Sequence, residues 1–467
     1  MFPKVCLTGA AALIMSLPYP ALAFAQESLP VVRTEAGQVR GVGEHGVQRF
    51  LGIPFARPPV DELRWRAPQP TPAWAGVHDA IDYGHDCMQT PFPSDAAPLG
   101  VTPAEDCLYL NVWKPNDVTA PLPVMVWIYG GGFVNGGSSP AVYSGAALAA
   151  DGVVVVSFNY RVGRFGTYAH PQLTLANEDD GRLANYGFMD QLAALEWVQK
   201  NIAAFGGDPS NVTLVGESAG GMSVHAMMTS PLSAGLFQKA VIQSGGTGSI
   251  AGGDLASAEA TGLTFAAQHA IAPSDPKALE KLRALSADDV TDGLNMMALF
   301  APNGGPRTFS SPIVDGRVAV DAADAYRRGV YHHVPIVIGA TSDDIGGPDG
   351  VMIAGARTMT DLISRHSPVF YYRFDYVADS QRTPTTRGAA HATEIPFFFR
   401  TVDARYGSAA TDRDQAASRV ASTYLLNFVK AGNPNGNGLP EWRSVTETDR
   451  GRLDFTPEGG AEFETER

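Results

Sequence analysis

The sequence Val212-Thr213-Leu214-Val215-Gly216-Glu217-Ser218-Ala219-Gly220-Gly221 indicates the fold more directly than any other stretch of the chain. It sets a serine in the pattern G-x-S-x-G, after an apolar run that predicts a strand and before a segment that predicts a helix. This context is typical of a nucleophile elbow, a sharp turn in which flanking glycines leave room for an exposed serine hydroxyl. The alternative is an ordinary glycine-rich turn, so the other residues that a nucleophilic serine needs must also be found.

Apolar runs alternate with helix-like segments on both sides of this stretch. Near-continuous apolar runs are typical of strands that are covered on both faces. Such runs are Leu122 to Tyr129, Val153 to Asn159, Val212 to Val215, Val241 to Gln243, Pro335 to Ile338 and Val369 to Phe374. Helical spacing of apolar residues extends over Met189 to Ala204 and Ala416 to Lys430. This alternation predicts an α/β fold with a central, mostly parallel, twisted sheet and helices on both faces.

Two regions interrupt the alternation. Residues 57–105 are rich in Pro, Asp and Trp, and residues 248–311 are rich in Ala and Gly, with a helical part at Leu279 to Leu285. We expect both to be excursions from the sheet, because no low-complexity linker separates them from it. Residues 26–467 are therefore predicted to form one domain.

Composition limits the classes of partner. The chain has 467 residues, of which 45% are hydrophobic and 18% charged, as in a globular protein. Its formal net charge is −14 and it has no run of Lys or Arg. Nucleic acids and anionic membrane surfaces repel such a chain, so we expect neither as a partner.

The first 25 residues have the features of a secretory signal peptide. Lys4 supplies a positive end, and the apolar run from Val5 to Leu17 is too short for a bilayer, which needs roughly 20 residues. Small residues allow cleavage after Ala23 or Ala25. The alternative is a buried N-terminal helix. We expect an exported protein, periplasmic or extracellular, without a stable membrane anchor, because no later apolar segment is long enough to span.

Removal of residues 1–25 leaves two cysteines, Cys87 and Cys107. An even pair in an exported chain suggests a disulfide. Metal binding is the weaker alternative, because zinc sites need a nearby CxxC pair or paired histidines.

Three glycines follow the apolar run Leu122 to Tyr129 at its carboxyl end. The backbone N–H groups of Gly131 and Gly132, with that of Ala219 after the serine, are candidates for an oxyanion hole. The alternative is a flexible turn, which the nearby Gly136 and Gly137 fit equally well.

A base and a carboxylate complete the set that a serine hydrolase requires. His391 lies in a loop after the apolar run that ends at Phe374, and catalytic side chains of open α/β sheets lie in such loops. Asp343 and Asp344 follow the apolar run before it. The order serine, acid, histidine is that of α/β-hydrolases. The other candidates are less suitable, because His332 and His333 precede a strand and His225 lies on the helix after the serine.

Several independent motifs make the sequence resemble the carboxylesterase type B, or cholinesterase-like, branch of the α/β-hydrolases. They are Phe50 to Ala56 (FLGIPFA), Glu105 to Val112 (EDCLYLNV), Gly130 to Phe133 (GGGF), Asn159 to Arg161 (NYR), Asn185 to Val224 and the segment GAAHATEIPFFF around His391. The resemblance covers most of the mature chain. It implies an α/β-hydrolase fold with loop and helical insertions that form a gorge. It also implies roles for site residues: Ser218 as nucleophile, His391 as base, Gly131, Gly132 and Ala219 as oxyanion donors, and a Cys87–Cys107 disulfide.

Two departures from the family pattern concern the acid. The family carries Glu followed by Gly, where this chain has Asp344 followed by Ile345. We favour Asp344 over Asp343 because it matches the motif position, and Asp can hold the same imidazole tautomer. The segment between Asp344 and His391 is also shorter than in the family, which predicts a more open substrate entrance.

These observations predict a secreted serine carboxylesterase that acts on small-molecule esters through an acyl-enzyme on Ser218, without a metal or cofactor. Bulky or xenobiotic esters would suit an open entrance. Two alternatives remain: a non-catalytic binding protein on the same fold, and an amidase or acyltransferase with the same triad. The sequence leaves the oligomeric state open.

Overall fold

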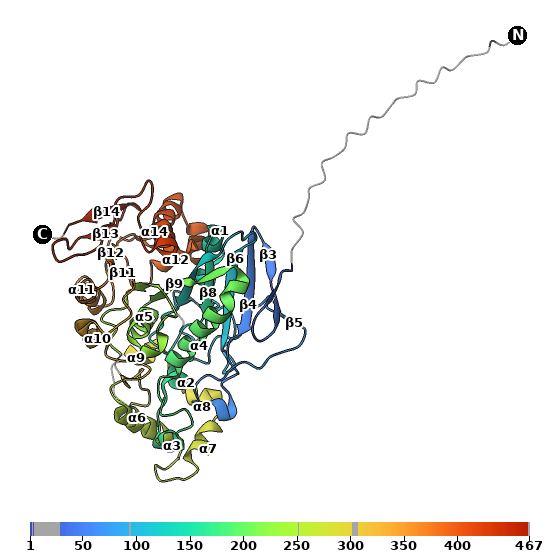
Figure 1. The fold of residues 1–467 in the computed structure, drawn as a ribbon, viewed down its shortest axis with the longest axis vertical. Coiled ribbons are helices and arrows are strands. Elements are labelled where there is room, and N and C mark those ends of the chain that lie inside the picture. Colours follow the sequence, from blue (N-terminus) through green and yellow to red (C-terminus); the bar gives the residue numbers. More distant parts are fainter. Residues whose placement is uncertain (2, 4–28, 93–94, 251, 301–306, 466–467) are drawn as a thin grey trace.

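The computed structural model describes residues 1, 3, 29–92, 95–250, 252–300 and 307–465 (Figure 1). The predicted signal peptide, residues 1–25, therefore falls outside the described part of the chain, apart from Met1 and Pro3. Among the described residues, no helix has the length and apolar character that a membrane crossing requires.

A large mixed sheet forms the centre of the molecule. Within the described residues it has 11 strands. In spatial order they are β14 (Ala461–Glu464), β13 (Arg452–Phe455), β12 (Val369–Phe374), β11 (Ile336–Thr341), β10 (Lys239–Gln243), β9 (Gly207–Glu217), β7 (Leu122–Ile128), β8 (Val154–Phe158), β6 (Tyr109–Pro115), β4 (Val47–Pro54) and β3 (Val42–Glu44). A separate small sheet contains β1 (Val31–Arg33), β2 (Gln38–Arg40) and β5 (Val77–Asp79).

The central strands are parallel and the edges are antiparallel. Strands from β8 through β7, β9, β10, β11 and β12 to β13 pair in parallel. Antiparallel pairs join β13 to β14 at one edge and β8, β6, β4 and β3 at the other. All six apolar runs of the sequence lie in parallel strands, and strands β8, β10 and β11 are buried at every residue. The predicted mostly parallel α/β sheet is thus confirmed.

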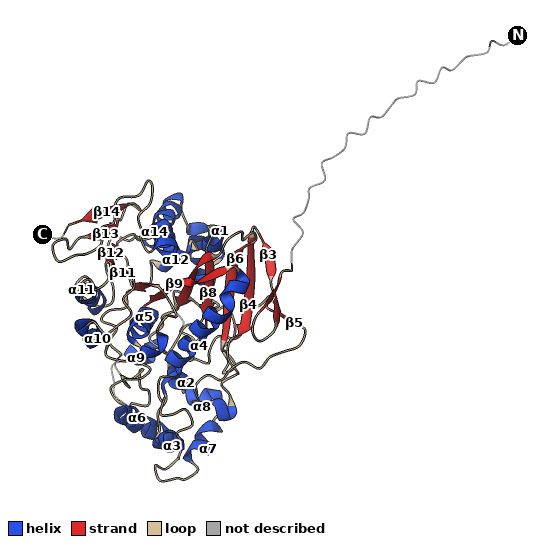
Figure 2. Ribbon diagram, in the orientation of Figure 1, coloured by secondary structure: helices blue, strands red, loops and turns tan. Residues whose placement is uncertain are grey.

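Helices cover the sheet on both sides. In the view of Figure 2, α1, α12 and α14 lie above strands β6, β8 and β9, while α4 and α5 lie on the lower side of β9. The helices are α1 (Ala146–Ala150), α2 (Gly163–Thr167), α3 (Pro171–Ala176), α4 (Tyr186–Asn201), α5 (Ala219–Thr229), α6 (Leu255–Gln268), α7 (Ala278–Arg283), α8 (Ala287–Thr291), α9 (Met296–Phe300), α10 (Ala322–Arg328), α11 (Val351–Ile363), α12 (Ile395–Phe399), α13 (Val402–Tyr406) and α14 (Asp412–Ala431). Single 3₁₀ turns lie at Asp61–Leu63, Ala141–Tyr143, Ile202–Phe205, Pro231–Ser233, Asp379–Gln381 and Gly407–Ala409.

The two helices predicted from spacing have clear local start and stop signals. Thr411 and Asp414 form a capping box that begins α14, and Gly432, with φ 71°, ends it. Helix α4 continues into a 3₁₀ turn that stops at Gly206, where φ is 83°. Glycine accepts this left-handed conformation without strain, so both helices end where the glycines of the sequence require.

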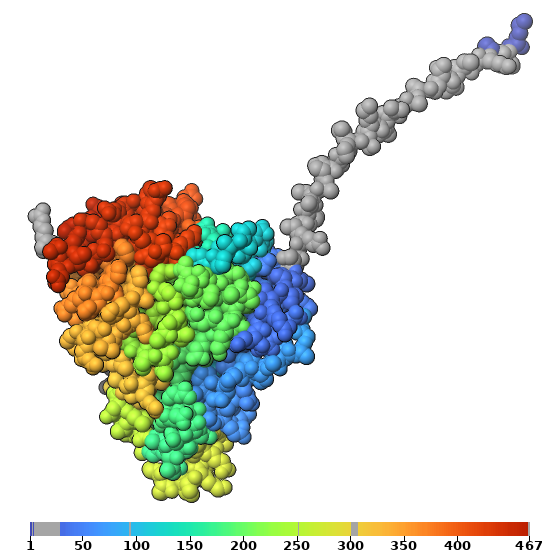
Figure 3. All heavy atoms as spheres, viewed as in Figure 1, coloured from blue at the N-terminus to red at the C-terminus, as the bar shows by residue number. Residues whose placement is uncertain are grey.

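The two interrupting regions lie outside the layers of sheet and helices that hold the elbow. Helices α6 and α7, from region 248–311, form the narrow lower end of the molecule together with α3 (Figures 1 and 3). Region 57–105 is mainly loop. The disulfide joins Cys87 of this region to Cys107, just before β6. The predicted disulfide is therefore present. It closes a loop with a sequence separation of 20 residues.

Candidate active site

Ser218 occupies the turn between β9 and α5. Its φ of 55° and ψ of −122° are a strained backbone conformation for a residue with a side chain. The turn is close-packed, because a Cβ on Gly220 would lie 2.0 Å from the Ile128 carbonyl oxygen, and one on Gly216 would lie 2.3 Å from the Gly220 carbonyl oxygen. Only glycine fits at these two positions. The G-x-S-x-G pattern therefore forms the sharp strand–turn–helix of a nucleophile elbow.

The structure brings Ser218, His391 and Asp344 into one hydrogen-bonded chain. Ser218 Oγ lies 2.9 Å from His391 Nε2, and His391 Nδ1 lies 2.6 Å from Asp344 Oδ1. The other histidines considered as bases contact different groups: His225 is buried against the Tyr326 hydroxyl, and His332 contacts the Ser230 carbonyl oxygen. The arrangement has the geometry of a nucleophile, a base and an orienting acid.

Asp344 is held by hydrogen bonds on both carboxylate oxygens. Oδ2 accepts from Ser244 Oγ at 2.7 Å and from Thr341 Oγ1 at 2.8 Å, and Oδ1 accepts from the Ile345 N–H at 2.7 Å. Burial raises the pKa of Asp344, but its hydrogen bonds, above all that with His391, outweigh burial and hold the pKa below the usual value. Asp344 is therefore ionised and fixed.

Asp343, the alternative acid, points elsewhere. Its carboxylate pairs with Arg387, with an Nη2–Oδ1 distance of 3.0 Å. Of the two adjacent carboxylates, only that of Asp344 contacts the imidazole.

The candidate oxyanion donors adjoin Ser218. Gly131 has φ 102° and Gly132 has φ 62°, and Ala219 is the first residue of α5. Within the described part of the chain, the N–H groups of these three residues have no protein acceptor. Gly131 lines the same cavity as Ser218. These N–H groups are therefore candidates to bind an oxygen atom that carries negative charge.

Glu217 is a second carboxylate at the imidazole, and sequence reasoning assigned it no role. Its Oε1 lies 3.3 Å from His391 Nε2 and has no hydrogen-bond partner among the described residues. Burial, together with the charge of Asp344, outweighs the charge of His391 and raises the pKa of Glu217 to about 7. Burial alone would lower the pKa of His391, but the charge of Glu217 and the hydrogen bond and charge of Asp344 prevail and raise it to about 9. Glu217 thus favours the imidazolium, the form that appears when the base takes a proton.

Glu394 is a third buried carboxylate in this region. Burial, with the charges of Glu217 and Asp344, raises the pKa of Glu394 well above its usual value, so this side chain is neutral. Its Oε1 lies 3.5 Å from Ser244 Oγ, which also donates to Asp344. The spacing H-x-x-E from His391 was the available sequence signal for this residue.

Ser218 opens into a cavity of about 250 Å³. Phe92 and Asp95 to Ala97 from region 57–105 line it, as does Met296 from region 248–311. Both regions therefore shape the site. Among the described residues, none between Asp344 and His391 lines the cavity. Its remaining lining residues are Gly130, Gly131, Asn135, Gly136, Val142, Tyr143, Glu217, Ala392, Thr393, Ile395, Pro396 and Arg405.

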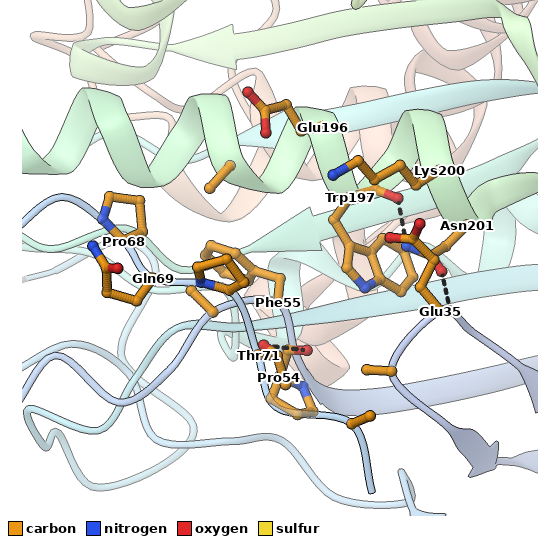
Figure 4. Close-up of a pocket in the computed structure, with 15 residues that line it drawn as sticks. Glu35, Pro54, Phe55, Pro68, Gln69, Thr71, Glu196, Trp197, Lys200 and Asn201 are labelled. Carbon is orange, nitrogen blue, oxygen red and sulfur yellow. Dashed lines mark hydrogen bonds between the residues drawn. The ribbon is translucent and has the colours of Figure 1, made fainter.

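A second cavity, of about 230 Å³, lies between α4 and the N-terminal loops (Figure 4). Glu196, Trp197 and Lys200 line it from α4, and Phe55 and Gln69 line it from the loops. The described residues that line it include no serine and no histidine, so they do not offer a nucleophile with a base. In the described part of the chain, no group of three or more His, Cys, Asp or Glu residues has the arrangement of a metal site.

Comparison with known proteins identifies the family of this chain. The sequence model of the carboxylesterase family matches residues 28–352 and 347–466. The para-nitrobenzyl esterase of Bacillus subtilis (strain 168) is 34% identical over 477 residues, which cover 91% of this chain and 94% of that protein. The fumonisin B1 esterase of Sphingopyxis macrogoltabida is 42% identical over 318 residues, which cover 67% of this chain and 56% of that protein.

Solved structures show the same relationship. A structure of PNB esterase matches with a TM-score of 0.82 and 30% identity, and the match covers 94% of this chain and 97% of that one. A carboxylesterase from Geobacillus stearothermophilus matches with a TM-score of 0.79 and 31% identity, over 93% of this chain and 98% of that one. The predicted α/β-hydrolase fold is confirmed. The chain therefore belongs to the carboxylesterase family, whose members are serine hydrolases that act on carboxylic esters.

Proposed function

We propose that this protein hydrolyses carboxylic esters through an acyl-enzyme on Ser218, with His391 as base and Asp344 as orienting acid. The observation that supports this assignment is the hydrogen-bonded chain from Ser218 Oγ to His391 Nε2, at 2.9 Å, and from His391 Nδ1 to Asp344, at 2.6 Å, beside an open cavity. Chemistry of this kind needs no metal or cofactor.

The mechanism follows from these contacts. His391 takes the proton of the Ser218 hydroxyl as Oγ attacks the ester carbonyl carbon. The carbonyl oxygen becomes negative and is stabilised by the N–H groups of Gly131, Gly132 and Ala219. His391 then protonates the leaving alcohol, and the acyl group remains on Ser218. Water releases the acid by the same steps in reverse order.

Substitution of the triad tests this function. We expect Ser218→Ala to lower kcat by about 10⁶-fold and Asp344→Asn by about 10⁴-fold, because the wrong imidazole tautomer is then held. Asp343→Asn is the matched control and keeps wild-type kcat, since Asp343 contacts Arg387 instead. The measurement is p-nitrophenyl butyrate hydrolysis by variants with wild-type circular dichroism. Wild-type turnover by Ser218→Ala would refute the function, and a larger loss in Asp343→Asn than in Asp344→Asn would refute the choice of acid.

The raised pKa of His391 predicts the pH dependence of the reaction. Only the neutral imidazole acts as a base, so kcat/KM for a neutral ester should rise with pH, with an inflection above 6.5, the ordinary value. The charge of Glu217 raises the pKa of His391 more than the charge of Asp344 does. Glu217→Gln removes the Glu217 charge and should therefore shift the inflection to lower pH. The matched control is Glu196→Gln, an exposed carboxylate of α4. An inflection that Glu217→Gln leaves in place contradicts the electrostatic account.

We further propose that bulky or xenobiotic esters are substrates. The cavity lacks a wall from residues between Asp344 and His391, within the described part of the chain, and this favours an open entrance. Relatives with the names para-nitrobenzyl esterase and fumonisin B1 esterase also support acceptance of such esters. Export to the periplasm or outside the cell is part of this proposal, supported by the signal-like residues 1–25 and by the disulfide.

A panel of esters tests the substrate class. Large aromatic and branched esters should have kcat/KM values similar to or above those of p-nitrophenyl acetate and butyrate, because discrimination is expressed in that ratio. A steep preference for the acetate and butyrate alone would contradict the open entrance. Amide versions of the best substrate serve as controls for the reaction type.

A further inference from the structure

Gln89, next to the disulfide, uses its whole side-chain amide to hold the glycine loop behind Ser218. Oε1 accepts from the Gly136 N–H at 2.9 Å and from Asn135 Nδ2 at 3.1 Å. Nε2 donates to the Gly136 carbonyl oxygen at 2.6 Å and to the Cys87 carbonyl oxygen at 2.8 Å. Both acceptor sites and both donors of the amide are thus occupied. The side chain is buried, so these bonds have little competition from water.

Asn135, which Gln89 contacts, is in turn hydrogen-bonded to Gly131, one of the candidate oxyanion donors. The Gly131 carbonyl oxygen accepts from the Asn135 N–H at 2.9 Å and from the Val134 N–H at 3.1 Å. A Cβ on Gly131 would lie 2.3 Å from the Asn135 carbonyl oxygen, so the two ends of this short loop are in close contact. A shift of Asn135 and Gly136 would therefore displace Gly131.

Asp86 provides a second attachment to the same loop. Its Oδ1 accepts from the Ser138 N–H at 3.1 Å and from the Ser139 N–H at 3.3 Å, and its Oδ2 accepts from Ser139 Oγ. Cys87 lies between Asp86 and Gln89 and is bonded to Cys107. Residues 86–89 thus form a fixed support for residues 135–139, outside the catalytic triad.

A glycine loop needs such a support. Glycine permits the backbone conformations of Gly131 and Gly132, but it does not select them over others. Oxyanion donors act only when they already point at the developing charge, and a small misplacement costs much of the rate.

We propose that Gln89 is a positioning residue for the oxyanion hole, and that the Cys87–Cys107 disulfide holds Gln89 in place. The proposal rests on the proposed role of Gly131 and Gly132 as oxyanion donors. Gln89 does not touch the substrate; it acts on the transition state through Asn135 and Gly136.

Kinetics of Gln89→Ala test the proposal in the full-length protein. We expect kcat for p-nitrophenyl butyrate to fall by about ten- to a hundredfold, with KM changed less than about threefold, because only transition-state binding is weakened. An aryl trifluoromethyl ketone gives an independent readout. The Ser218 hydroxyl adds to its carbonyl carbon, the proton passes to His391, and the ketone oxygen becomes the oxyanion. Its Ki should rise by the same factor as kcat/KM falls.

Gln199→Ala is the matched control. The amide of Gln199 also donates to two backbone carbonyl oxygens, those of Pro209 and Leu236, both at 2.9 Å, but far along α4 from the glycine loop. We expect this variant to lose thermal stability and to keep wild-type kcat and Ki.

Gln89→Glu is a second variant, in case Gln89→Ala does not fold. It preserves the shape of the side chain and one accepting oxygen, but it places a second oxygen against the carbonyl oxygens of Gly136 and Cys87, so kcat should fall here too. A kcat within twofold of wild type in either folded Gln89 variant overturns the proposal, as does an equal loss of kcat in Gln199→Ala. Activity that persists in Ser218→Ala would instead overturn the proposed function, so the two failures are distinguishable.

Discussion

The hydrogen bond between Ser218 Oγ and His391 Nε2 is the interaction on which the site depends. It joins residues that are 173 positions apart in the sequence. It forms because parallel strands end at the same edge of the sheet: Ser218 follows β9, Asp344 follows β11, and His391 lies in the loop after β12. The apolar runs that bury these strands thereby determine where the three side chains meet.

The charges around the half-buried His391 stabilise the imidazolium that forms when this base takes a proton. Asp344 is ionised and accepts several hydrogen bonds, whereas Glu394 is neutral because burial and two neighbouring charges raise its pKa. The pKa of Glu217 lies between those of Asp344 and Glu394, and its carboxylate faces His391 Nε2. Similar side chains thus have different charge states because their hydrogen-bond donors differ, and the positive imidazolium is stabilised when it forms.

Much of this arrangement was predictable from the sequence, because its signals are local. Apolar runs marked the parallel strands, glycines marked the ends of α4 and α14, and motif order pointed to Ser218 and His391. Asp343 and Asp344 show where local signals end: both follow β11, and only their side-chain contacts, Arg387 for one and His391 for the other, separate them. Glu217, although part of the opening motif, acquires its significance only from its distance to the imidazole. The support of the glycine loop by Gln89 joins segments from different parts of the chain, so no spacing in the sequence reveals it. The single-domain organisation of residues 26–467 stays a prediction.

Covalent labelling tests directly whether Ser218 is an activated nucleophile, and it does not depend on the choice of ester. The protein is treated with a fluorophosphonate probe, and the site of the adduct is located by peptide mass spectrometry. One adduct per chain is expected, on Ser218, and none in Ser218→Ala. A folded wild-type protein that remains unlabelled, as a binding protein on the same fold would, or that carries the adduct on another residue, would contradict this expectation.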